Sequence, residues 1–229
     1  MEINELIERS LKVDTSSLSD ALDSLGLVGC LPGIRQQVEG ASFAGPAFTV
    51  RYGPYDEEFV GFRGASNYLD EVPEGAVVVI DNQGKGGCTV WGDILSEYAV
   101  QKGVAATVIH GAARDISEIR ALQYPLFSSH IYMRSGKNRV TKQEIGGVLG
   151  IHEVTIAPGD WVIGDANGCL VIPRDQLEEV LRRAEAIERT ESKIRAVVAA
   201  GMGLKEARAL HGYHAPWEEL SNEVASHGA

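Results

Sequence analysis

The sequence predicts an α/β fold in which helices pack around a mixed central sheet. Two continuous apolar, β-branched runs, residues 76–80 and 104–109, have the composition of strands buried on both faces, which is typical of parallel strands. An amphipathic segment at 93–102, ended by Gly103, predicts a helix between them. Strand, helix and strand in this order form a right-handed crossover unit. Short strands and one long helix follow.

The other elements are predicted by local signals along the chain. The first helix is expected at 15–25, where Asp14 or Thr15 can cap the first turn and Gly26 ends the helix. Pro173 begins the longest helix, whose apolar residues recur at helical spacing to about residue 200. The shorter elements expected are a strand at 47–51, a loop at 81–87, a loop and helix over 110–122, and strands at 125–127, 153–156, 161–163 and 169–172.

Composition excludes several classes of protein. The 229 residues carry 21 Lys and Arg against 32 Asp and Glu, a net charge of −11 that disfavours nucleic acid as a partner. No apolar run approaches the ~18 residues of a membrane helix, and the acidic N-terminus is unlike a signal peptide. Three widely spaced cysteines are typical of reduced thiols, so we expect a cytoplasmic protein. We expect one domain over 1–229, with 201–229 as a C-terminal arm that is a candidate to pack on a neighbouring subunit.

Polar residues follow both strands of the predicted crossover. Gly92-Asp93 begins one helix and Arg114-Asp115 the next, and residues 94–113 between them are one helix plus one strand, so the two segments should converge at one sheet edge. The backbone N–H groups of residues 92–95 could hold a carboxylate. Asp115 and Asp93 could bind a hard divalent cation directly or through water, and Arg114 could stabilise an oxyanion.

A purely structural interpretation of the same residues is open at this point. Asp115 and Glu118 have the spacing of a capping box, so Asp115 could simply cap a helix. Asp93 could be an ordinary first-turn acid favoured by the helix dipole. Spacing alone does not separate these interpretations from a functional site.

From residue 77 to residue 173 the chain resembles the RraA-like family, which includes the 4-hydroxy-4-methyl-2-oxoglutarate / 4-carboxy-4-hydroxy-2-oxoadipate aldolases. The main pattern is an Asp, twenty residues and Arg-Asp, found here as Asp93 and Arg114-Asp115. The other matching pieces are Gly45-Pro46-Ala47, Trp91-Gly92-Asp93-Ile94-Leu95, Pro158-Gly159-Asp160, and Asp165-x-Asn167-Gly168 followed by Val171-Ile172-Pro173.

The resemblance implies a swivelling β/β/α domain that assembles as homotrimers or hexamers, with sites at subunit interfaces. It also implies a Mg²⁺-dependent class II pyruvate aldolase, for which Mn²⁺ or another divalent cation is an alternative. Asp115 would bind the metal directly and Asp93 through water. Arg114 would contact the keto oxygen of pyruvate, and the amides of Gly92, Asp93, Ile94 and Leu95 would hold its carboxylate. The neighbouring subunit would contribute a glutamate, for which Glu191 is the candidate.

The expected activity is retro-aldol cleavage of a 4-hydroxy-2-oxo acid, such as 4-hydroxy-4-methyl-2-oxoglutarate, to pyruvate and a second keto acid, with oxaloacetate decarboxylation as a side activity. Two alternatives stay open: Schiff-base chemistry at Lys85, and a regulator that binds ribonuclease E without catalysis, as in some relatives. The strand before Arg114 usually ends in Asp-Gly in this family, whereas here it ends in His110-Gly111. His110 is either a polar contact of the site or a structural histidine.

Overall fold

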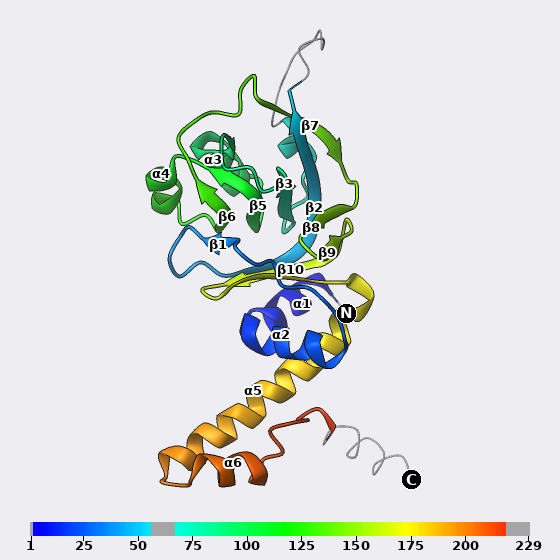
Figure 1. Ribbon diagram of the computed structural model, residues 1–229, viewed down its shortest axis with the longest axis vertical. Helices are drawn as coiled ribbons and strands as arrows, with labels where there is room; N and C mark the ends of the chain where they lie inside the picture. Colours follow the sequence, from blue (N-terminus) through cyan, green and yellow to red (C-terminus); the bar gives the residue numbers. More distant parts are fainter. Residues whose placement is uncertain (1, 56–66, 219–229) are drawn as a thin grey trace.

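The computed structural model describes residues 2–55 and 67–218, an α/β body from which a long helix projects (Figure 1). Helices α3 (Asp93–Gln101) and α4 (Ile116–Ala121) belong to the body. At the other end, below strand β10, lie α1 (Ile3–Ser10), α2 (Thr15–Ser24) and the start of α5 (Leu177–Ala199). The expected α/β class and mixed sheet are confirmed.

In the part of the chain that the structure describes, the main sheet has nine strands in the order β1-β6-β5-β3-β2-β10-β11, with β4 paired to β5 and β7 to β2. The pairs β2–β3, β3–β5, β5–β6 and β4–β5 are parallel, and the others are antiparallel. Strand β2 pairs with β10, β3 and β7 along its length, which curls the sheet. The strands span Arg35–Gln36 (β1), Phe43–Pro54 (β2), Val77–Asp81 (β3), Thr89–Trp91 (β4), Ala106–Ala113 (β5), Leu126–Ile131 (β6), Val140–Ile145 (β7), Trp161–Asp165 (β10) and Gly168–Ile172 (β11).

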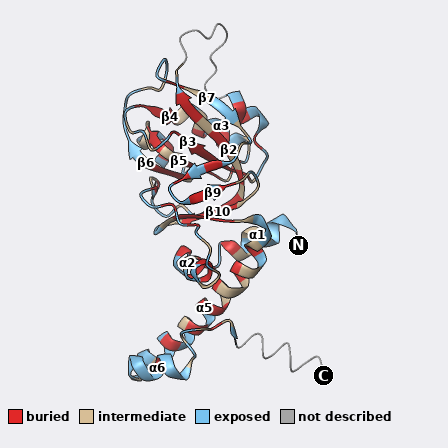
Figure 2. Cartoon of the chain, turned by 45° about the vertical axis from the view of Figure 1, so that its right-hand side comes forward, coloured by how far each residue is buried: buried red, intermediate tan, exposed pale blue. Residues whose placement is uncertain are grey.

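Both faces of the central strands are buried, as their β-branched composition predicts (Figure 2). Val78 and Ile80 pack into the core that also contains Trp91 and Ile119. Val79 packs on the opposite face, into a core closed by the separate hairpin β8 (Leu149–Ile151) and β9 (Val154–Ile156). Successive residues of one strand therefore pack into two different cores, one on each face of the sheet.

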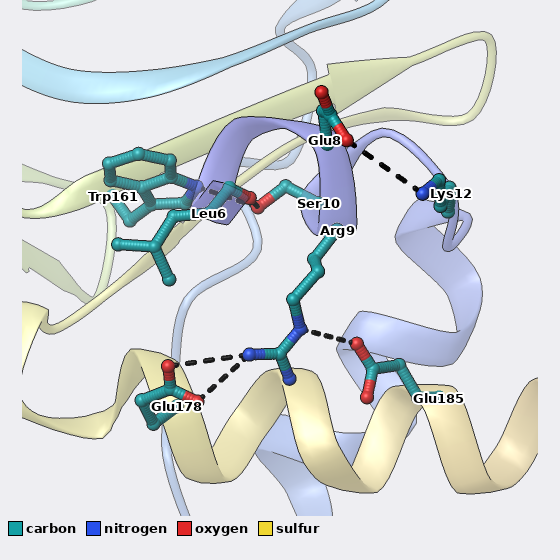
Figure 3. A network of polar contacts seen from close by, with 8 residues as sticks. All are labelled: Leu6, Glu8, Arg9, Ser10, Lys12, Trp161, Glu178 and Glu185. Carbon is teal, nitrogen blue, oxygen red and sulfur yellow. Dashed lines mark hydrogen bonds and ion pairs between the residues drawn. The ribbon is translucent and has the colours of Figure 1, made fainter. Parts of the chain in front are cut away.

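Helices α1, α2 and α5 form a third core against β10 and β11. In Figure 3, Trp161 Nε1 donates to Ser10 Oγ at 2.9 Å, and Ser10 Oγ donates to the Leu6 carbonyl at 2.7 Å. Arg9 reaches from α1 to α5, with Nε 2.7 Å from Glu185 and Nη1 3.0 Å from Glu178. These carboxylates raise the pKa of Arg9, so the cross-link stays charged.

The C-terminal arm folds back along its own chain over the residues described, 201–218. Helix α6 (Leu204–Leu210) contacts α5, and Trp217 packs on the third core under the Arg183 guanidinium, 5.3 Å from the ring centroid. Residues 219–229 of the predicted arm lie outside the described residues, and its packing on a neighbouring subunit stays a prediction. In the described part of the chain, no helix is long and apolar enough to cross a membrane.

The structure differs from the sequence prediction mainly at strand ends and polar strands. The second buried strand continues past residue 109 to Ala113, so His110 lies within β5 and not in a loop. Strand β7 has the mixed sequence Val-Thr-Lys-Gln-Glu-Ile and was not anticipated, because its pairing with β2, not an apolar pattern, makes it a strand. Helices α1 and α6 and the short strands β1, β4 and β8 were also missed.

One pH-dependent contribution to stability arises on α5. Hydrogen bonds from Arg182, together with Arg183, lower the pKa of Glu179 from 4.5 to about 2. Because the unfolded chain binds this proton first as the pH falls, the stabilisation is complete above pH 4.5 and is lost between pH 4.5 and 2. The side chain is about one-third exposed, so the effect should stay below about 1 kcal/mol. We expect the melting temperature of Glu179→Gln to fall less than that of the wild type between pH 5 and 2. An equal fall in both proteins would contradict this.

Candidate active site

The two polar segments predicted to converge do meet in space. Strand β4 runs parallel to β5, with Trp91 opposite Ala113, so the chain leaves both strands at the same edge. Arg114 N–H donates to the Trp91 carbonyl at 3.1 Å. The bond joins the segment that begins α3 to the segment that precedes α4, and it places Gly92 beside Arg114 and Asp115.

Helix α3 begins at Asp93 without a side-chain cap, because its N-cap residue is Gly92. Two of the N–H groups expected to hold a substrate carboxylate contact aspartates instead. Ile94 N–H donates to Asp93 Oδ1 at 2.8 Å, and Asp93 N–H donates weakly to Asp115 Oδ2 at 3.4 Å. These two N–H groups are therefore bound by carboxylate oxygens of the chain itself, and binding of a substrate carboxylate at this helix start stays a prediction.

The Asp115 side chain does not cap helix α4. Its backbone is left-handed, with φ 56° and ψ 41°, and its carboxylate makes no capping hydrogen bond, so the capping-box interpretation is wrong. Asp115 Oδ2 lies 3.1 Å from Arg114 Nε instead. A left-handed non-glycine residue costs on the order of 1 kcal/mol or more, and such strain concentrates at functional sites.

Both segments open into one cavity of about 590 Å³. Arg114 is about two-fifths exposed and Asp115 about one-third, so both heads are accessible to a small ligand. One wall of the cavity is formed by residues 135–138 and Thr141, from β7 and the loop before it. The sequence did not predict this wall, because it did not predict β7. The cavity is lined by Tyr52, Tyr55, Thr89, Val90, Trp91, Gly92, Asp93, Ile94, Leu95, Arg114, Ser135, Gly136, Lys137, Asn138, Val140 and Thr141.

The donor set at this cavity fits a hard divalent cation. Asp93 lines the cavity, and Asp115, whose Oδ2 lies 3.4 Å from the Asp93 backbone N, offers a second carboxylate beside it. In the described part of the chain, no sulfur or imidazole donor lines the cavity. Among the residues described, no group of three or more His, Cys, Asp or Glu side chains could hold a metal ion. A cation here would therefore keep several water or substrate ligands, which Mg²⁺ tolerates well.

Other predicted residues lie away from this cavity. Glu191 lies on α5, where it accepts from Arg195 at 2.9 Å and lines a separate 300 Å³ cavity with Asp20 and Trp217. Within one chain it is not brought to Arg114, so its role depends on a neighbouring subunit and stays a prediction. Lys85 is exposed in the loop after β3, whereas a Schiff-base lysine is activated by desolvation or by a neighbouring cation.

His110 does not line the cavity. Its place in β5 puts its side chain on the same face as Val108, which packs in the core closed by the β8–β9 hairpin. Trp91, beside the cavity, packs in the core of the opposite face. His110 Nδ1 lies 2.9 Å from Asp81 Oδ1, so any influence on the site is indirect.

Replacing Gly92 with alanine should reduce the activity more than the stability of the protein. A Cβ at Gly92 would lie 2.5 Å from Asp115 Oδ2, the movable end of a side chain, and its extended backbone (φ −159°) suits any residue. We expect Gly92→Ala to change the unfolding free energy by less than about 1 kcal/mol but to lower turnover by about 10–100-fold, since displacements near 1 Å can cost that much. Thermal melts and steady-state rates measure both; an unchanged rate would show that the Asp115 position is unimportant.

The comparisons with known proteins agree with this fold. A family model described as RraA-like: Aldolase/RraA matches residues 15–171, and the chain belongs to this RraA-like family. A Halalkalibacterium halodurans protein named "Putative 4-hydroxy-4-methyl-2-oxoglutarate aldolase" is 34% identical over 79% of this chain and 82% of its own. The structure of Streptomyces coelicolor RraAS2, described as an unusual member of the RNase ES inhibitor RraA protein family, matches with a TM-score of 0.76 and 26% identity, over 84% of this chain and 97% of that chain.

One relative is much longer than this chain. Protein DlpA of Legionella pneumophila subsp. pneumophila is 43% identical over 221 residues, which are 96% of this chain and 36% of DlpA. The chain therefore spans about a third of the length of that relative.

Proposed function

We propose that the protein is a divalent-metal-dependent pyruvate aldolase that cleaves a 4-hydroxy-2-oxo acid to pyruvate and a second keto acid. The observation that carries this proposal is that Arg114 and the start of α3, Asp93 included, line one cavity, while the Asp115 carboxylate lies 3.1 Å from Arg114 Nε. Kinship with proteins named as aldolases supports it. A substrate such as 4-hydroxy-4-methyl-2-oxoglutarate has the keto oxygen and 1-carboxylate that these groups would bind.

The chain's own residues have distinct tasks in this proposal. The N–H groups at the start of α3 bind the substrate 1-carboxylate, and Arg114 donates hydrogen bonds to the 2-keto oxygen. A base, which we take to be a bound water, removes the proton of the 4-hydroxyl. The O–H electron pair forms the new C4 carbonyl, the C3–C4 bond breaks, and its electron pair becomes the C2–C3 double bond of pyruvate enolate. Arg114 stabilises the enolate oxygen, and protonation at C3 gives pyruvate.

Asp115, with Asp93 through water, would hold Mg²⁺, Mn²⁺ or another divalent cation. When bound, such a cation supplies Lewis-acid polarisation of the keto group. The same enolate forms when oxaloacetate loses CO₂, so oxaloacetate decarboxylation belongs to the proposal. We further propose a homotrimer or hexamer in the cytoplasm, with Glu191 of a neighbouring subunit near the site.

Pyruvate release from oxaloacetate and from 4-hydroxy-4-methyl-2-oxoglutarate tests the reaction class. We expect turnover with Mg²⁺ or Mn²⁺, its loss in EDTA, and its return when the cation is added in excess. The circular dichroism spectrum recorded in EDTA should stay native, because the described cores are built from apolar side chains. No turnover of either substrate with any divalent cation would contradict the proposal.

The alternative is a regulator that binds ribonuclease E without catalysis. The observation that favours it is the similarity to RraAS2, whose family is described as RNase ES inhibitors. A pull-down with ribonuclease E separates the two functions when wild type is compared with Arg114→Ala. Capture that is equal for both proteins, together with no turnover, would favour the regulator.

A further inference from the structure

We propose that His110 is a positioning residue which, with Asp81, holds the loop 82–87 and thereby sets the start of α3 relative to Arg114 and Asp115. This inference rests on the proposed function for its effect on turnover, while its effect on the loop can be measured separately. It concerns a residue that does not line the cavity.

The pairing of strands β3 and β5 places His110 beside Asp81. Asp81 is the last residue of β3, and its registered partner on β5 is His110. The side chains lie on the same face, with Nδ1 and Oδ1 2.9 Å apart and exposed fractions of 16% and 8%. The ring of His152, from the turn of the β8–β9 hairpin, lies 4.9 Å from the His110 ring and packs against it. The His110 imidazole is therefore in contact with both the Asp81 carboxylate and the His152 ring.

His110 and Asp81 together hold the first half of the loop. The His110 carbonyl accepts the N–H groups of Asn82 at 3.0 Å and Gly84 at 3.1 Å. Asp81 Oδ1, which contacts His110, also accepts Gln83 N–H at 2.7 Å. Three successive loop amides are thus bound by one residue pair.

The imidazole also packs directly on the loop. Gly84 has φ +67°, and a Cβ there would lie 2.9 Å from His110 Nε2, so only glycine lets the loop approach the ring this closely. The Asn82 side chain is buried, yet neither amide atom has a hydrogen-bond partner among the residues described. The N–H groups of residues 82–84 are therefore bound by His110 and Asp81, and the Asn82 side chain contributes no hydrogen bond within the described part of the chain.

The loop and the strand of His110 are each followed along the chain by one of the two segments that form the candidate site. After residue 87 the loop continues into β4 and Gly92, while the strand of His110 continues to Arg114 and Asp115. The two halves approach so closely that a Cβ on Gly92 would lie 2.5 Å from Asp115 Oδ2. A loop that moves by a few tenths of an ångström would therefore change the distance between the helix amides and the reacting groups, which reduces turnover steeply.

Two substitutions of His110 separate the contacts of its ring. In His110→Asn the amide can still donate to Asp81 from the position of Nδ1. In His110→Gln the longer side chain places its amide near the position of Nε2 and loses the Asp81 bond. We expect His110→Gln to raise the rate of amide hydrogen exchange across residues 82–95 about tenfold. We also expect it to lower kcat/KM for oxaloacetate with Mg²⁺ by about 10–100-fold. Part of this loss should be a higher KM, because the amides proposed to bind the carboxylate shift. His110→Asn should stay within about threefold of wild type in both measurements.

His214→Gln is the matched control, because His214 lies beside Tyr213 in the C-terminal arm, and it should change neither measurement. Unchanged exchange and turnover in His110→Gln, or equal damage in His110→Asn, would overturn the inference. If the wild type turns over no substrate but exchange still rises only in His110→Gln, the proposed function fails while the hold of His110 on the loop is supported. The experiment therefore distinguishes a failure of the proposed function from a failure of the inference about His110.

Discussion

Replacing Arg114 with alanine is expected to lower both oxaloacetate decarboxylation and aldol cleavage by about 10²–10³-fold. The guanidinium lies beside Asp115 at the mouth of the cavity, where the charge of the enolate oxygen would develop. Its loss removes a stabilisation that grows as the C3–C4 bond breaks, so kcat should fall more than KM rises. Because Arg114 is about two-fifths exposed and fills no core, the melting temperature should stay within about 2 °C of wild type.

Arg114→Lys distinguishes charge from geometry at the same position. Lysine keeps the positive charge but lacks the planar fork that can contact a keto oxygen and a carboxylate together, so we expect at most a partial recovery. Arg120→Ala is the control, since Arg120 lies on helix α4 and its Nε donates to the Gln37 carbonyl, away from the cavity lining. Near-native turnover of Arg114→Ala, or an equal loss in Arg120→Ala, would show that the site is assigned wrongly.

Asp115→Asn and Asp115→Gly should abolish metal-dependent turnover without destabilising the protein. Asp115 is left-handed at φ 56° and makes no capping bond, so its side chain is not required by helix α4. Asparagine and glycine both adopt this conformation more readily than most residues, and glycine should raise stability by a few tenths to about 1 kcal/mol. Turnover should fall by about 10²-fold or more, and the concentration of Mg²⁺ needed for half-maximal activity should rise.

Gln123→Gly is the matched control for this backbone effect. Gln123 follows α4 with φ 53°, also left-handed, and its side chain donates to the Arg120 carbonyl. It should gain a similar stability while activity stays at the wild-type level. A large loss of stability in Asp115→Asn would show that Asp115 is structural, and unchanged turnover would show that it holds no metal.

Much of the fold is predictable because its signals are local. Helix α2 begins where Asp14 accepts from Ser17 N–H, and it is followed by Gly26 at φ +67°, as capping rules predict. Strand β3 is buried at every position, as its unbroken β-branched run predicts. The convergence of residues 92–93 and 114–115 also follows from sequence, because parallel strands joined by a crossover end at the same sheet edge.

The sequence by itself therefore determined the α/β class, the buried central strands and the meeting of Arg114-Asp115 with the start of α3. Only the tertiary structure decided what each side chain does there. Spacing allowed Asp115 to cap α4, and its backbone conformation shows that it does not. Likewise, His110 belongs to a strand face turned from the cavity, and β7 supplies an unforeseen wall. These outcomes depend on strand register and on contacts between distant segments, which local sequence periodicity does not encode.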